Sequence, residues 1–261
     1  MTGTDRTPSP PDIRDREEKE LVRQRVWSEL MRVARPDSRF HWNFSEFIPD
    51  FEGSDRCAQA VRDLPEYRRA RVVFVTPDNG LTLIRQLCME DGKDLLVSTY
   101  GIERGFLFVP TGSVEPSRVP YAATLDGLDY VGHPVSLREL ASGPRLDLLL
   151  TGAAAISTGG LRFGKGHGYF DLEWGMFREV GLVADDTPVV AIVHDCQVVD
   201  VDVQPRPFDT VVDVIVTPTR VLRPPLTHEK PSGINWELLE PGMVERIPPL
   251  RELTELRAPK R

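Results

Sequence analysis

Short runs of apolar residues alternate with segments of helical periodicity along most of this chain. The apolar runs are rich in Val, Leu and Ile, which is typical of buried strands. We expect strands over residues 72–75, 95–98, 106–109, 146–150, 189–193 and 211–216, and helices from about residue 15 and over 81–89, 134–141 and 169–180. Runs that are apolar throughout need cover on both faces, so the pattern predicts an α/β fold with a parallel or mostly parallel sheet.

The two ends of the chain depart from this pattern. Residues 1–14 are rich in Pro, Ser and Thr, and we expect a disordered N-terminal tail there. Residues 15–222 are expected to form one α/β domain. Beyond residue 222 prolines recur, so we expect residues 223–261 to be an irregular, proline-rich C-terminal extension.

Composition narrows the class of protein. The chain has 261 residues and a net charge of -8, which gives no support to nucleic acid as a partner. Its three cysteines are widely spaced and form no CxxC pair, as expected for reduced thiols. The N-terminus lacks the apolar core of a signal peptide, and no apolar run approaches the length of a membrane span. We therefore expect a cytoplasmic protein with no membrane partner.

Candidate chemistry concentrates between residues 160 and 171. The segment contains the glycines Gly160, Gly164, Gly166 and Gly168, the cations Arg162 and Lys165, and the carboxylate Asp171. Exposed N–H groups before a helix form an anion cradle, and a carboxylate can hold Mg²⁺. The spacing fits neither GxxxxGK[ST] nor GxGxxG. On glycine content alone, a flexible surface turn remains the alternative.

The order of residues in this segment resembles a known family signature. The sequence GLRFGKGHGYFD from Gly160 to Asp171 is similar to G-x-R-L-G-x-G-x-G-Y-Y-D-R of the 5-formyltetrahydrofolate cyclo-ligases, also called methenyltetrahydrofolate synthetases. The family's K-x-x-x-R resembles Lys19 and Arg23, and its D-x-x-V-D-x-I-x-T resembles residues 209–217. The resemblance covers residues 17 to 222.

The resemblance implies a three-layer α/β/α, Rossmann-like fold. It implies a ligase that uses ATP and Mg²⁺ to convert 5-formyltetrahydrofolate, a reduced folate, to 5,10-methenyltetrahydrofolate with release of ADP and phosphate. The formyl oxygen is phosphorylated first, and the second folate nitrogen then displaces phosphate. A homodimer is compatible with the resemblance.

The resemblance also implies roles for single residues. Lys19, Arg23, Gly164, Gly166, His167 and Gly168 are expected to bind the nucleotide, Arg162, Lys165 and Tyr169 to serve catalysis, and Asp171 to position Mg²⁺. Without the resemblance, Lys19 and Arg23 fit a solvated helix face in a segment full of charges, and His167 fits an exposed loop.

The stretches at residues 171–174 and 193–197 resemble a divergent branch, similar to the methenyltetrahydrofolate synthase domain-containing proteins, and three departures from the family pattern bear on activity. Leu172 replaces the family's Arg, Phe208 replaces a His, and the stretch near Asp78 lacks the family's substrate-contacting Glu. The alternative function is therefore a family member that binds nucleotide or folate but has lost cyclo-ligase activity, with a regulatory, carrier or different-substrate role.

Two other clusters allow more than one interpretation. The run His194-Asp195-Cys196 suggests a metal or thiol site, but adjacent residues on a strand point to opposite faces, so a pocket-lining or structural role is favoured. The aromatic residues Trp42, Phe44 and Phe47 fit either the cover of a pterin ring or the packing of a long loop, and we favour packing.

Overall fold

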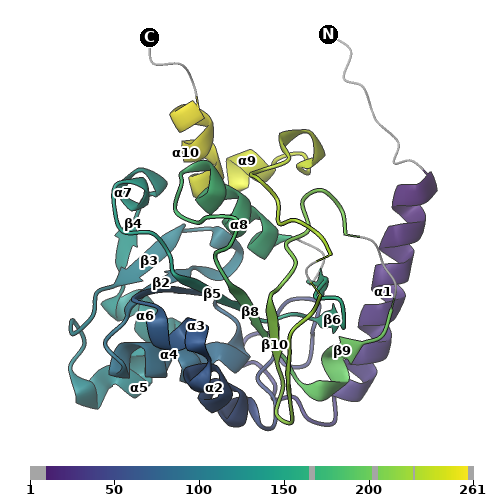
Figure 1. The fold of residues 1–261 in the computed structure, drawn as a ribbon, viewed down its shortest axis with the longest axis horizontal. Helices are drawn as coiled ribbons and strands as arrows, with labels where there is room; N and C mark the ends of the chain where they lie inside the picture. Colours follow the sequence, from purple (N-terminus) through teal and green to yellow (C-terminus); the bar gives the residue numbers. More distant parts are fainter. Residues whose placement is uncertain (1–9, 165–167, 202–204, 226, 258–261) are drawn as a thin grey trace.

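A large sheet forms the centre of the computed structural model, which describes residues 10–164, 168–201, 205–225 and 227–257 (Figure 1). Its strand order is β11-β10-β8-β5-β1-β2-β3-β4. The strands are β1 (Val72–Val75), β2 (Asp94–Ser98), β3 (Phe106–Val109), β4 (His133–Val135), β5 (Leu148–Thr151), β8 (Val189–Ile192), β10 (Val214–Val216) and β11 (Val221–Leu222). Neighbours from β10 to β2 are parallel, whereas the pairs that involve β11, β3 and β4 are antiparallel. The predicted mostly parallel α/β sheet is confirmed.

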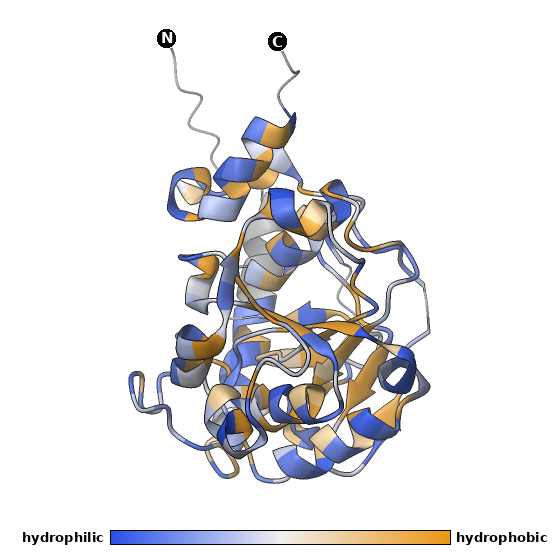
Figure 2. Ribbon diagram, turned by 90° about the vertical axis from the view of Figure 1, so that its left-hand side faces the viewer, coloured by the Kyte–Doolittle hydropathy of each residue, from blue (hydrophilic) through white to orange (hydrophobic). Residues whose placement is uncertain are grey.

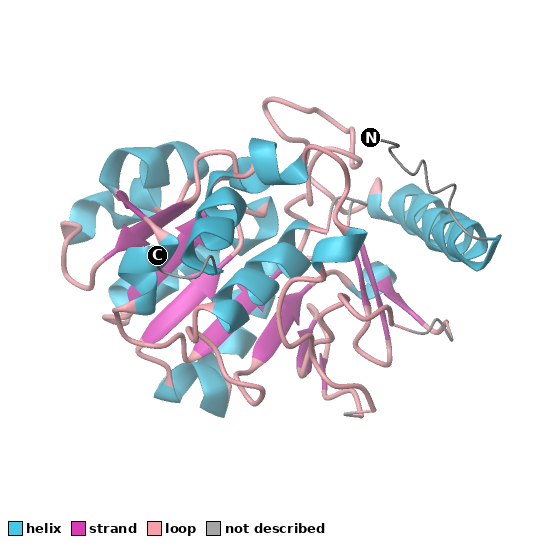
Figure 3. Ribbon diagram, turned by 90° about the horizontal axis from the view of Figure 1, so that it is seen from above, coloured by secondary structure: helices cyan, strands magenta, loops and turns pink. Residues whose placement is uncertain are grey.

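Helices cover both faces of this sheet. The helices of the described ranges are α1 (Pro10–Leu30), α2 (Ser54–Asp63), α3 (Pro65–Arg69), α4 (Thr82–Glu90), α5 (Val119–Ala122), α6 (Leu125–Val131), α7 (Leu137–Ala141), α8 (Tyr169–Glu179), α9 (Met243–Arg246) and α10 (Pro248–Arg257). Helices α2 to α4 and α6 contribute to the core on one face, and α7 to α10 to the core on the other. The expected three layers are visible when the molecule is seen from above (Figure 3).

The period-two alternation of the strands divides the core between these layers. In β1, the side chains of Val73 and Val75 join the cluster under α2 and α4, whereas Phe74 packs edge-on against Phe177 of α8 at 5.0 Å between ring centroids. Every residue of β1 is buried, so apolar side chains are required on both faces. Hydropathy colouring shows the same division, with apolar strands between helices of mixed character (Figure 2).

Helix α1 lies beside a second, smaller sheet that the sequence pattern did not predict. This sheet has the order β7-β6-β9, with β6 (Ala155–Ser157), β7 (Arg162–Phe163) and β9 (Val198–Val199). Val26 of α1 packs with Ala155, Leu161 and Phe163. The glycine-rich segment therefore begins on a strand that is held against α1, and Lys19 and Arg23 come close to it.

One predicted helix start was wrong. Residues 133–135 form the edge strand β4, and the helix begins after Ser136, which caps α7 together with Glu139 in a reciprocal capping box. Pro134 lacks an N–H, which an edge strand tolerates better than a helix interior does. Helix α1 also starts earlier than expected, at Pro10 rather than near Asp15.

The C-terminal extension was expected to be irregular, and this expectation was wrong for its last part. Helices α9 and α10 place Met243, Ile247, Leu250 and Leu253 in the core beside α8. Glu252 accepts hydrogen bonds from the first two N–H groups of α7, at 2.9 and 3.0 Å. None of the helices in the described ranges is long and apolar enough to cross a lipid bilayer.

Candidate active site

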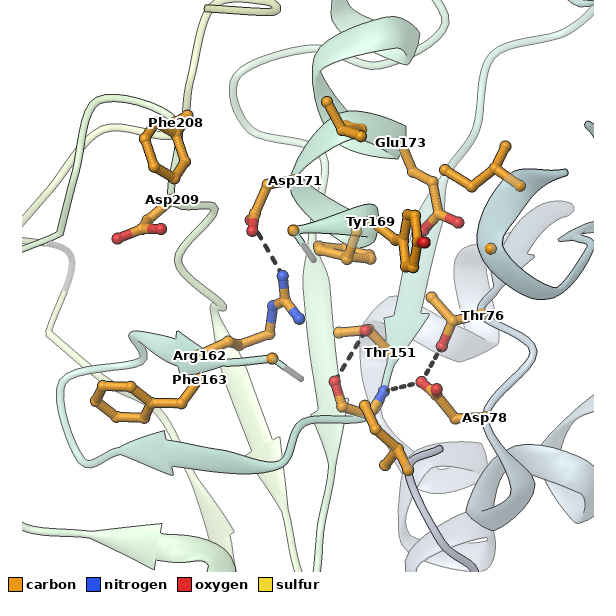
Figure 4. Close-up of a pocket in the computed structure, with 18 of the residues that line it drawn as sticks. Thr76, Asp78, Thr151, Arg162, Phe163, Tyr169, Asp171, Glu173, Phe208 and Asp209 are labelled. Carbon is orange, nitrogen blue, oxygen red and sulfur yellow. Dashed lines mark hydrogen bonds and ion pairs between the residues drawn. The ribbon is translucent and has the colours of Figure 1, made fainter. Parts of the chain in front are cut away.

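A cavity of about 360 Å³ opens where the carboxyl ends of β1, β2 and β5 meet the start of α8. Loops beyond these strand ends are the usual place for a ligand in an open α/β sheet. The lining includes Lys19, Arg23, Thr76, Asp78, Tyr100, Gly152, Arg162, Gly164, Gly168, Tyr169, Asp171, Leu172, Glu173, Arg206, Phe208 and Asp209. Figure 4 shows most of the polar groups among them.

The turn after β1 presents the carboxylate of Asp78 at one side of this cavity. Oδ2 of Asp78 accepts hydrogen bonds from Thr76 Oγ1 at 2.5 Å and from the backbone N–H of Gly152 at 2.9 Å (Figure 4). A Cβ at position 152 would lie only 2.9 Å from this oxygen, so glycine is needed there. Buried Arg85 donates to the carbonyls of Thr76 and Asp78 at 2.9 and 3.0 Å, which holds the turn in place.

An ion pair joins the small sheet to α8. The guanidinium of Arg162 on β7 lies 3.1 Å from Asp171 Oδ1 in the first turn of α8, and 4.2 Å from the centroid of the Phe170 ring. The N–H of Thr210 donates to the same Oδ1 at 2.8 Å. Arg162 Nε is buried without a hydrogen-bond partner among the described residues. Burial raises the pKa of the Asp171 carboxyl, and the Arg162 charge opposes this rise.

Helix α1 brings two further cations to the cavity. Lys19 Nζ lies 3.1 Å from Asp209 Oδ2, and Arg23 pairs with Glu20 at 2.6 Å. Arg23 also reaches the carbonyl of Gly164 at 3.5 Å, so it contacts the glycine-rich segment directly. Arg23 hydrogen bonding lowers the pKa of Glu20. The two α1 cations share one helix face, as expected, and that face is turned to the cavity rather than to open solvent.

Glu173 is a functional candidate that the sequence analysis missed. Its side chain lies on the inner face of α8, lines the cavity and is 2% exposed. Oε2 has no hydrogen-bond partner in the described part of the chain. Burial raises the pKa of Glu173 to about 8; the neighbouring Ser98 hydroxyl opposes this rise, whereas the charge of Asp78 adds to it. A buried carboxyl oxygen without a partner among the described residues is costly for folding, so its position at a cavity makes Glu173 a candidate for ligand binding.

The cavity brings together every predicted site residue that the structure describes, namely Lys19, Arg23, Arg162, Gly164, Gly168, Tyr169 and Asp171. Lys165, Gly166 and His167 lie outside the described residues. Gly168 has a φ of 64° directly before α8, a conformation that favours glycine. The individual roles of these residues stay predictions.

Asp171 lies in the predicted helix. It belongs to the first turn of α8, and its ion pair with Arg162 stabilises the contact between α8 and β7. The two hydrogen bonds that Arg162 and the N–H of Thr210 donate to Asp171 both use Oδ1. Within the described ranges, no group of three or more His, Cys, Asp or Glu side chains is placed to hold a metal ion. Any Mg²⁺ held here would therefore need phosphate or water oxygens as its other ligands.

The run His194-Asp195-Cys196 lies outside this cavity. His194 Nδ1 accepts from the N–H of Cys196 at 3.2 Å, and Asp195 accepts from the hydroxyls of Thr217 and Thr219 at 2.7 and 2.6 Å. Burial raises the pKa of the Cys196 thiol to about 11, which disfavours a thiolate. These contacts support a structural role for the run His194-Asp195-Cys196.

The three aromatic residues of the 36–55 loop divide between packing and the cavity. Phe44 and Phe47 are buried together with Leu30 of α1, and Phe47 also lines the cavity. Trp42 is 43% exposed and does not line it. Packing is therefore the main role of this group, as expected.

Leu172 and Phe208, which replace an Arg and a His of the family signature, both line the cavity. Leu172 is buried in the core cluster of α8, so position 172 offers no cation. Arg178 cannot replace that cation, because it pairs with Asp185 at the far end of the helix and does not line the cavity. Arg206 lines the cavity and supplies a positive charge from the loop before Phe208.

Comparison with known proteins shows the family of this chain. Residues 15–218 match the model of the 5-formyltetrahydrofolate cyclo-ligase family. A methenyltetrahydrofolate synthase domain-containing protein from Homo sapiens is 36% identical over 238 residues, which is 90% of this chain and 61% of that protein. Its counterpart from Mus musculus is 36% identical over 240 residues, covering 91% and 63%, and that from Danio rerio is 32% identical over 240 residues, covering 90% and 61%.

The chain thus spans less than two thirds of the length of these curated relatives. Among solved structures, the NMR structure of Aquifex aeolicus 5,10-methenyltetrahydrofolate synthetase matches with a TM-score of 0.46 and 18% identity, over 78% of this chain and 92% of that one. Because the family model covers most of the chain and includes the β7–α8 segment that forms the cavity, this protein belongs to the 5-formyltetrahydrofolate cyclo-ligase family.

Proposed function

We propose that this protein converts 5-formyltetrahydrofolate and ATP to 5,10-methenyltetrahydrofolate, ADP and phosphate in an Mg²⁺-dependent reaction. The observation that carries the proposal is the convergence of Lys19, Arg23 and Arg162 on one cavity from two distant parts of the chain. Three cations around a glycine-rich segment suit a triphosphate, because they neutralise its charge and fix its position.

The reaction needs activation of a poor leaving group. The formyl oxygen attacks the γ-phosphorus, ADP leaves, and the formyl carbon then carries a phosphate ester. The second folate nitrogen attacks this carbon, loses its proton, and the C–O bond breaks to release phosphate. The protein contributes mainly by holding the two substrates in line and by stabilising the charge on the transferred phosphoryl group.

The two ends of the cavity suit the two substrates. Arg162, whose Nε has no partner within the described ranges, and the α1 cations form the phosphate end. Asp78 and Glu173 provide hydrogen-bonding groups at the other side, where a reduced folate presents N–H groups. Asp171 would hold Mg²⁺ through its carboxylate, and the metal would neutralise phosphate charge when bound.

The proposal is tested by mixing purified protein with 5-formyltetrahydrofolate, ATP and Mg²⁺ and following methenyltetrahydrofolate absorbance. We expect ATP-dependent product from the wild type and a fall in kcat on the order of 100-fold in Arg162→Lys. The matched control is Arg178→Lys, which also alters an arginine paired with an aspartate but lies away from the cavity. No product from a wild type that binds both ligands would instead favour the inactive carrier or regulatory alternative.

A further inference from the structure

The C-terminal segment 233–243 forms a wall of the cavity although it follows the residues that match the family. The family match ends at residue 218, whereas residues of this segment are part of the cavity lining. These lining residues are Gly233, Ile234, Asn235, Leu238, Leu239, Glu240 and Met243. The site of this chain is therefore larger than the matched region.

Hydrogen bonds attach the segment to α8. Trp174 Nε1 donates to the carbonyl of Pro231 at 2.8 Å, and Glu179 Oε1 accepts from the N–H of Ile234 at 3.0 Å and from Trp236 Nε1 at 2.9 Å. Trp174 is fully buried, so its bond to Pro231, just before the segment, belongs to the core. The segment is thus fixed to the same helix that carries Tyr169, a catalytic candidate, and Asp171, the candidate for Mg²⁺.

The contact between α8 and the segment is close. A Cβ on Gly175 would lie 2.6 Å from Ile234 Cδ1 and 3.1 Å from the carbonyl carbon of Gly233. Downstream, Leu250 and Leu253 of α10 are 0% and 1% exposed. With anchors on both sides, the segment is a built wall rather than a loose tail.

The side chains that this wall contributes are mainly apolar. Ile234 and Leu239 are half-buried and pack at the edge of the main core, and Met243 is buried. Oε2 of Glu173, which has no partner among the described residues, belongs to the same cavity, so an apolar surface and a hydrogen-bonding group occur together. This combination suits a flat heterocycle with polar edges.

We propose that residues 233–243 bind the ring system of the reduced folate and that Leu239 contacts this ring. The proposal rests on the proposed function only for the identity of the ligand. It adds a folate-binding wall outside the matched family region, and it assigns the nucleotide to the opposite, cationic end of the cavity. Truncating Leu239 should therefore weaken folate binding while ATP binding is retained.

The test is calorimetric binding of 5-formyltetrahydrofolate and of Mg²⁺-ATP, each alone, to the full chain. Leu239→Ala should raise the Kd for the folate on the order of tenfold and leave the Kd for ATP within about twofold. Leu239→Met, which conserves volume, should restore most of the affinity. The matched control is Leu256→Ala, the same truncation at a half-buried leucine of α10 that packs on the same core but does not line the cavity.

Several outcomes would overturn the proposal. An unchanged folate Kd in Leu239→Ala would do so, and so would an equal loss for folate and ATP, which would indicate a structural role. A wild type without measurable folate affinity would refute both this wall and the proposed function. A wild type that binds folate but forms no product refutes the reaction alone, and the response of the folate Kd to Leu239→Ala then still decides the proposal.

Discussion

Glu173 gives a direct physical test of the geometry of the site. Its carboxyl is buried, and burial raises its pKa from an ordinary value of 4.5 to about 8. The pKa is higher in the folded than in the unfolded protein, so the folded state keeps a proton that the unfolded state loses. The stabilisation of the folded state by protonated Glu173 is fully present below pH 4.5 and is lost as the pH rises through about 8.

The size of the effect follows from the linkage relation. Between pH 6 and pH 8, the raised pKa lowers the unfolding free energy of the wild type by about 2 kcal/mol relative to that of a variant that cannot ionise at position 173. Glu173→Gln is that variant, because the amide has nearly the same shape and stays neutral. The groups around Glu173, namely Ser98, Asp78, Arg162 and Asp171, are present in both proteins, so their own contributions largely cancel in the comparison.

The assay is urea unfolding of wild type and Glu173→Gln at pH 6, 7 and 8 without ligand. From pH 6 to pH 8, we expect the unfolding free energy of Glu173→Gln to rise by about 2 kcal/mol relative to that of the wild type. Glu255→Gln, at an exposed glutamate of α10, should follow the wild type at each pH. Parallel pH profiles for wild type and Glu173→Gln would refute the reasoning, because they would mean that the carboxyl is solvated or already paired.

Three further predictions concern the cavity. Asp171→Asn should weaken Mg²⁺-ATP binding, which calorimetry measures. It should also lower the unfolding free energy, measured in urea, by about 3 kcal/mol, because it breaks a buried ion pair. Unchanged ATP binding would show that Asp171 does not hold Mg²⁺. Lys19→Ala should raise KM for ATP more than KM for folate. Equal changes in the two KM values would mean that Lys19 belongs to a solvated helix face and does not bind ATP. Gly152→Ala should destabilise the protein by about 1–3 kcal/mol, because its Cβ would meet the Asp78 carboxylate 2.9 Å away; an unchanged melting temperature would contradict the described turn.

Much of the central sheet could be predicted because buried parallel strands are recognisable as apolar runs. An apolar run does not indicate the direction of its strand. The antiparallel pairing of β3 with β2 and of β11 with β10 was therefore not predictable. The strands of the small sheet have two or three residues, which is too short for any periodicity. Pro134 fits both a helix start and an edge strand, and only the capping box at Ser136 decides between them.

Some residues of the candidate site could likewise be predicted from the sequence, and others could not. Arg162, Gly168 and Asp171 could be named because they are close in sequence and share one glycine-rich pattern. The hydrogen bond between Asp78 and Gly152 joins residues 74 positions apart and has no local signature. Glu173 has the helical spacing of an ordinary α8 residue, so only the packing shows that it is buried at a cavity. The wall at residues 233–243 lies in a proline-rich stretch without periodicity, and its position depends on contacts with α8.

The central claim is that the formyl oxygen is phosphorylated in this cavity and leaves with the phosphate. It is tested most directly with 5-formyltetrahydrofolate that carries ¹⁸O in its formyl group, incubated with the protein, ATP and Mg²⁺. The account predicts methenyltetrahydrofolate together with one ¹⁸O in each inorganic phosphate released, as measured by mass spectrometry. Phosphate without the label, or ADP formed without methenyltetrahydrofolate, would contradict it.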